Sequence, residues 1–124
     1  MITGFSGELQ EMLLSESVSR PHTEYWQETA DLYELWCAGD EAALREYLTE
    51  DTSDLTEEEL ALYNEYNDAM LLDRNADMVT VASEYLESGD VVFYAVGLAH
   101  LLTGNGLVDA LRDAGYTVEL VTFA

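Results

Sequence analysis

The stretch Val91-Val92-Phe93-Tyr94-Ala95-Val96-Gly97-Leu98-Ala99-His100 decides how the fold is interpreted. Its first six residues form a continuous apolar run, which is typical of a strand buried on both faces. Residues 107–114 follow as an amphipathic helix that Gly115 ends, and residues 116–123 alternate like a second strand. A strand, a crossover helix and a returning strand predict a right-handed β-α-β unit with parallel strands over residues 90–124. Because two strands make a poor sheet, either the helices cover them or strands from elsewhere complete the sheet.

The preceding part of the chain, residues 1–88, is rich in Glu, Leu, Tyr and Ala and is predicted to be helical. Capping residues and apolar spacing predict helices over about residues 7–16 and 23–38, a short third helix that carries Ala43, Leu44 and Leu48, and a long helical stretch from Thr56 to about residue 88. The helix caps are expected at Ser6, Asp40 and Thr56, the ends at Gly39 and Gly89, and an interruption of the long stretch near Leu72-Asp73. We therefore expect one helix-rich α/β domain over residues 1–124, with about five helices and the β-α-β unit at its C-terminal end.

The charge of the chain is strongly negative, with 26 Asp plus Glu against four basic residues and a formal net charge of −22. The basic residues are all Arg. This excludes ordinary nucleic-acid binding, which needs several cations on phosphates, and docking on anionic membrane surfaces. A single cysteine, Cys37, excludes an internal disulfide framework and a cysteine-based zinc finger. No apolar run reaches the roughly 18 residues of a membrane span, and the N-terminus lacks the basic region of a signal peptide.

The densest cluster of special residues follows the first predicted strand. It contains His100 and three glycines, Gly97, Gly104 and Gly106, which could shape a turn or a substrate-binding loop. Active sites of parallel α/β sheets lie at such strand ends. His100 could ligate a metal or act as a base, or it could hydrogen-bond to the backbone of a tight turn. The glycine spacing is not that of a dinucleotide-binding loop, and without Lys there is no phosphate-binding loop.

A second candidate cluster is Arg74-Asn75, on the last helix before the first predicted strand. Asn75 lies in the middle of an apolar helix face, so its amide needs a polar partner. The pair could line a site, or Asn75 could cap a helix break while Arg74 pairs with local acids. The helix leads directly into the predicted strand, so the two should run antiparallel. About 14 helical residues and six extended residues cover similar lengths of roughly 20 Å. We therefore expect Asn75 or Arg74 within about 8 Å of the His100 ring.

These residues occur in an order that resembles the C-terminal part of the TraB/GumN family, which includes Tiki-type metalloproteases. The resemblance is carried by Arg74-Asn75-x-x-Met78, Phe93-Tyr94-Ala95-Val96-Gly97-Leu98-Ala99-His100-Leu101, Gly104-Asn105-Gly106-Leu107-Val108 and Leu111-Arg112-x-x-Gly115-Tyr116-x-Val118. It is specific over residues 73–121.

The resemblance implies an α/β protein of bacterial type whose hydrolytic site uses two G-x-x-H motifs. Residues 97–100 match the second motif, and the first is absent from this sequence. His100, Arg74 and Asn75 are then catalytic residues, with His100 also a metal ligand in an incomplete site. We expect a divalent metal in the complete protein but no tight metal binding by this chain alone, because catalytic sites need about three protein ligands.

By the same resemblance, the partners expected are the N-terminal half or a second chain, and a peptide or protein substrate. No nucleic acid and no membrane insertion by this segment are expected, and the resemblance allows a location in the cell envelope or export. The alternative is a non-catalytic acidic module that binds a basic partner.

Overall fold

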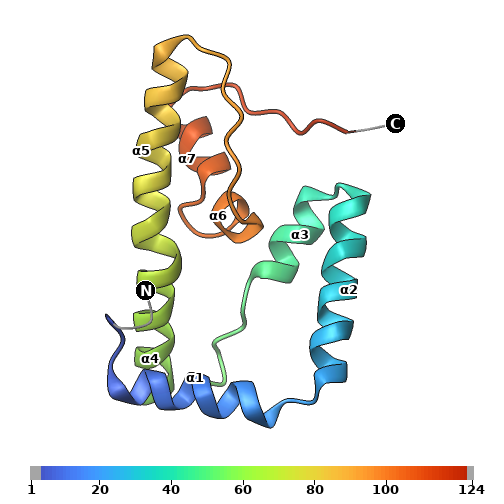
Figure 1. Cartoon of the computed structure of the whole chain (residues 1–124), viewed down its shortest axis with the longest axis vertical. Helices are drawn as coiled ribbons and strands as arrows, with labels where there is room; N and C mark the ends of the chain where they lie inside the picture. The colour runs from blue at the N-terminus through green and yellow to red at the C-terminus, as the bar shows by residue number, and fades with distance from the viewer. Residues whose placement is uncertain (1–3, 123–124) are drawn as a thin grey trace.

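The computed structural model describes residues 4–122. Its helices are α1 (Gly7–Ser19), α2 (His22–Ala38), α3 (Glu41–Leu48), α4 (Glu57–Asn67), the π-helical segment η2 (Asp68–Leu72), α5 (Asp73–Ser88), α6 (Leu98–Leu102) and α7 (Leu107–Asp113). The helices form an open frame: α4 and α5 run along one side, α1 lies across one end, and α2 with α3 stands on the opposite side (Figure 1). The short helices α6 and α7 lie beside α5, between the two sides.

The predicted helix starts are confirmed, because each rests on a local hydrogen bond. The side chains of Ser6 and Asp40 accept from backbone amides three residues later. Thr56 and Glu59 form the reciprocal capping box. The ends of α2 and α5 are also confirmed, since Gly39 and Gly89 adopt left-handed φ angles of 67° and 76°.

The interruption predicted near Leu72-Asp73 is a π-helical turn. Residues Asp68–Leu72 separate α4 from α5 without breaking the rod, and the amide of Asp73 donates to the carbonyl of Asp68, five residues earlier. The turn ends three residues before Asn75. Such turns are frequent at functional sites.

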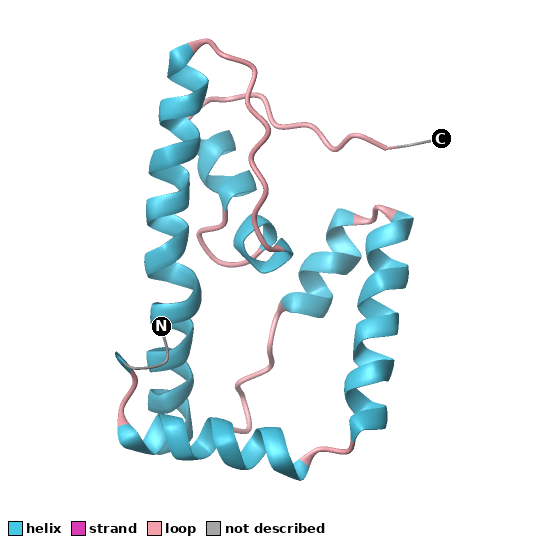
Figure 2. Ribbon diagram, in the orientation of Figure 1, coloured by secondary structure: helices cyan, strands magenta, loops and turns pink. Residues whose placement is uncertain are grey.

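The predicted α/β fold class is wrong. No strand is present within residues 4–122, and the part of the chain described is helical with long loops (Figure 2). Residues 91–96 and 116–122, which were predicted as strands, run as drawn-out loops (Figure 1), and neither segment pairs with another to form the parallel β-α-β unit. An extended segment becomes a strand only when a neighbour accepts and donates its backbone hydrogen bonds. Position 123 lies outside the described residues, and α6 was not predicted as a separate helix.

The core is small for a chain of this length. Six apolar side chains are buried in the described region, namely Phe5, Leu9, Leu44, Ala82, Leu102 and Leu107. Polar links supplement it: the amide and hydroxyl of Ser6 donate to the carboxylate of Glu65 at 2.6 and 2.7 Å, which joins the start of α1 to α4.

An arginine joins α3 to the two short helices. The guanidinium of Arg45 donates to both carboxylate oxygens of Asp109 on α7, at 2.7 and 2.8 Å, and to the carbonyl of Leu102 at 2.8 Å. Its third partner is Glu41, at 2.9 Å. The bidentate pair with Asp109 and the bond to Leu102 fix the start of α7 and the end of α6, and so hold the turn that separates the two helices.

Candidate functional site

The structure brings together His100 on α6 and Asn75 on α5. Oδ1 of Asn75 lies 2.7 Å from Nδ1 of His100, which confirms the predicted proximity. The return path is the reason: after α5 ends, residues 90–96 run back beside it (Figure 1), and the Tyr94 ring packs edge-on against Tyr85 with centroids 5.7 Å apart. Extended backbone is enough for this return, although the segment is not part of a sheet.

The buried amide of Asn75 has a second partner that sequence reasoning missed. Asn75 is fully buried, and its Nδ2 donates to Oδ1 of Asn105 at 3.1 Å. Asn105 lies in the turn between α6 and α7, and its own Nδ2 donates to the backbone carbonyl of Leu72 at 3.4 Å. The signal available in the sequence was the unpartnered amide on an apolar helix face, together with a second Asn in the glycine-rich turn.

This chain of hydrogen bonds fixes the orientation of every group in it. The carbonyl of Leu72 can only accept, so the Asn105 amide turns its nitrogen to Leu72 and its oxygen to Asn75. Asn75 must then direct its nitrogen to Asn105 and its oxygen to His100. Because that oxygen is an acceptor, Nδ1 of His100 carries the proton. Nε2 is therefore unprotonated in the neutral ring and keeps a free lone pair.

The electrostatic surroundings favour the neutral ring. Desolvation lowers the pKa of His100, and the positive charge of Arg74 lowers it further. Arg74 itself is exposed, and its guanidinium forms no ion pair with any acid of residues 4–122. The structure therefore places a neutral imidazole beside an unneutralised cation.

The three glycines near His100 differ in whether the structure requires glycine at their positions. A Cβ on Gly106 would lie 2.6 Å from the carbonyl oxygen of Leu101, so only glycine fits the close approach of this turn. Gly104 adopts a left-handed φ of 53°. Gly97 has neither constraint, since a Cβ there would meet the His100 ring at an ordinary 3.6 Å. Gly104 and Gly106 thus shape the turn that presents Asn105.

The residues present do not fit a catalytic metal centre by themselves. His100 offers one free nitrogen, and no group of three His, Cys, Asp or Glu side chains gathers anywhere in residues 4–122. The other histidine, His22, is exposed at the start of α2. Among the helices described, none has both the length and the apolar character needed to cross a membrane.

The fold and the site define a helical protein that presents one oriented, neutral imidazole next to an exposed arginine. The chain belongs to the TraB/PrgY/gumN family, whose model matches residues 1–120. The expected family is thereby confirmed, and the match extends over the N-terminal helices as well as the residues that carry the resemblance. No curated protein and no solved structure gives a significant match.

Proposed function

We propose that this chain supplies His100, Asn75 and Arg74 to the active site of a metal-dependent peptide hydrolase that residues outside the chain complete. The single observation that carries the proposal is the 2.7 Å contact between Asn75 Oδ1 and His100 Nδ1. It orients the imidazole and leaves Nε2 with a lone pair that can accept a proton or bind a metal.

Each residue then has a distinct role. His100 is the base or ligand. Asn75 is a positioning residue, because it acts through the His100 ring. Arg74 brings an exposed positive charge close enough to lower the pKa of His100, and such a charge can stabilise an anion that forms at the same site. The divalent metal of the complete protein would take its remaining ligands from outside this chain, because one imidazole does not make a catalytic site.

The test uses the coding sequence upstream of the Met1 codon. We expect it to encode a second G-x-x-H motif with a neighbouring acid, and co-expression of that segment with this chain to give metal-dependent cleavage of a peptide library. Cleavage should be lost in His100→Ala and retained in the matched control His22→Ala. The chain alone should cleave nothing with added divalent metal.

Three results would contradict the proposal. Metal-dependent cleavage by the chain alone, abolished by His100→Ala, would show that no second segment is needed. An upstream segment that lacks the motif would argue against a hydrolase. Co-expressed segments that bind metal but cleave no peptide would do the same, and both results would favour the other candidate function. That candidate is a non-catalytic acidic module for a basic partner, and the net charge of −22 is the observation in its favour.

A further inference from the structure

The chain has far more surface than a compact protein of its mass. It exposes 9303 Å². A compact monomer of 13.8 kDa exposes about 6,600 Å², so the excess is roughly 2,700 Å². Obligate interfaces bury areas of this order. The excess surface is therefore large enough to form a stable interface with another polypeptide.

The two extended segments, residues 91–96 and 116–122, contribute exposed apolar side chains to this surface. Val91 and Phe93 are 105% and 95% exposed, and Leu120 and Val121 are also exposed. Within the described part of the chain, the amides of residues 91–96 and 117–122 donate to no protein acceptor. The backbone carbonyl of Val118 accepts a hydrogen bond from the Arg112 guanidinium at 3.4 Å. Apolar side chains beside unpaired backbone amides are features of an open sheet edge, which readily accepts another strand.

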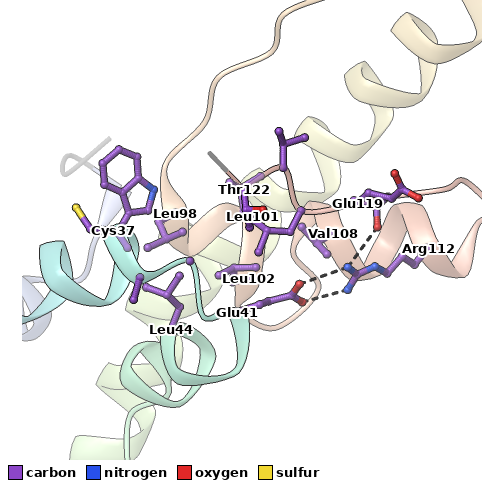
Figure 3. A pocket seen from close by; sticks show the side chains of 16 residues that line it. Cys37, Glu41, Leu44, Leu98, Leu101, Leu102, Val108, Arg112, Glu119 and Thr122 are labelled. Carbon is purple, nitrogen blue, oxygen red and sulfur yellow. Dashed lines mark hydrogen bonds and ion pairs between the residues drawn. The ribbon is translucent and has the colours of Figure 1, made fainter. Parts of the chain in front are cut away.

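One of these segments forms a wall of an apolar groove. The groove has a volume of about 500 Å³ and is lined by residues 118–122 together with Trp36, Leu44, Leu98, Leu101 and Val108 (Figure 3). Leu98 and Leu101 come from the same short helix as His100, but His100 is not among the lining residues. The groove is thus a second feature, separate from the imidazole site.

The charges at the groove favour one kind of partner. Glu41 holds Arg112 at 3.1 Å, so the guanidinium on the groove is already paired (Figure 3). Glu119, also in the lining, forms no ion pair with residues 4–122. With a charge of −22 on each chain, two copies repel one another. The same charge attracts a basic polypeptide to the chain.

We propose that residues 118–122 bind an extended strand of a second, basic polypeptide through backbone hydrogen bonds, with alternate apolar side chains of that strand in the groove. This mode of recognition supplies affinity through the main chain and specificity through pockets for every second side chain. The inference rests on the proposed function only in requiring a second polypeptide. The experiment measures peptide binding and not cleavage, so failure of the strand-binding proposal can be distinguished from failure of the proposed hydrolase function.

The probe is a synthetic peptide of alternating valine and lysine, titrated into the chain at about 0.15 M salt to screen diffuse attraction. We expect saturable binding, with amide NMR shifts concentrated at residues 118–122 and a change in the Trp36 indole signal. The same peptide N-methylated at every second amide keeps its side chains but loses donors, and should bind about tenfold more weakly.

Two exposed positions give matched variants. Leu120→Lys places a cation on the groove, whereas Val18→Lys makes the same charge change on α1, and the native side chains are 57% and 75% exposed. Leu120→Lys should weaken binding about tenfold, and Val18→Lys should leave it nearly unchanged. Circular dichroism checks that both variants are folded.

Several results would overturn the proposal. No saturable binding, equal binding of the N-methylated peptide, or equal weakening by the two variants would each show that there is no strand-binding site at residues 118–122. Self-association of the chain that Leu120→Lys abolishes would assign the groove to a second copy instead.

Discussion

Replacing Asn75 with leucine tests the polar chain that orients His100. Leucine has the same number and branching of side-chain heavy atoms as asparagine, so the fully buried position keeps a side chain of similar shape and loses its hydrogen bonds. The methyl groups are larger than the amide atoms, and their crowding adds to the loss from the two bonds. Two bonds disappear, one to His100 and one to Asn105. Asn105 is exposed and His100 partly so, and both can regain some hydration. At about 1–1.5 kcal/mol per bond, the free energy of unfolding should fall by about 2–3 kcal/mol.

The assay is urea unfolding followed by circular dichroism at neutral pH and moderate salt, supported by thermal melts. The expected loss lowers the midpoint temperature by roughly 8–12 °C for a chain of this size. Asn64→Leu is the matched control, because Asn64 is exposed on α4 and the same exchange there should change stability by less than about 0.5 kcal/mol. Equal effects of the two substitutions would refute the reasoning.

Three further perturbations follow from the same contacts and charges. Gly106→Ala should cost about 1–3 kcal/mol, because its Cβ would lie 2.6 Å from a backbone oxygen, whereas Gly97→Ala should be nearly neutral; equal melting temperatures would contradict this. Burial lowers the pKa of His100 in the folded chain, so the unfolded chain binds more protons. The contribution of the neutral His100 ring to the free energy of unfolding should be complete above about pH 6.5 and lost as the pH falls below that value. The stability difference between the native chain and His100→Gln should shrink accordingly, and a difference independent of pH would argue against a lowered pKa. Raising salt from about 0.05 to 0.5 M should raise the urea midpoint, because 26 acids repel one another; an unchanged midpoint would count against that repulsion.

Helix positions were predictable from the sequence because their determinants are local. The caps at Ser6, Asp40 and Thr56 act within three residues, and each forms the predicted bond. The strands were not predictable in the same way. The run at residues 91–96 has strand composition and is extended, but sheet formation depends on a neighbour that residues 4–122 do not supply.

The site was predictable in part. The closeness of Asn75 and His100 follows from lengths alone, since an extended return beside a helix brings the two ends together with or without a sheet. The role of Asn105 was not predictable, because the sequence indicates a turn between two glycines but does not show which way the Asn105 side chain points. Its orientation depends on the left-handed Gly104 and the crowded Gly106, and on the carbonyl of Leu72, the last residue of the π-helical turn.

The central claim is that Asn75 holds His100 as the Nδ1-protonated tautomer with Nε2 free. Two-bond ¹H–¹⁵N correlation spectra of the ¹⁵N-labelled chain measure this directly near pH 7.5, because protonated and unprotonated ring nitrogens have distinct shifts. We expect Nδ1 of His100 to be protonated and Nε2 to be unprotonated, while exposed His22 serves as an internal reference. A His100 ring protonated at Nε2, or averaged in the same way as His22, would contradict the claim.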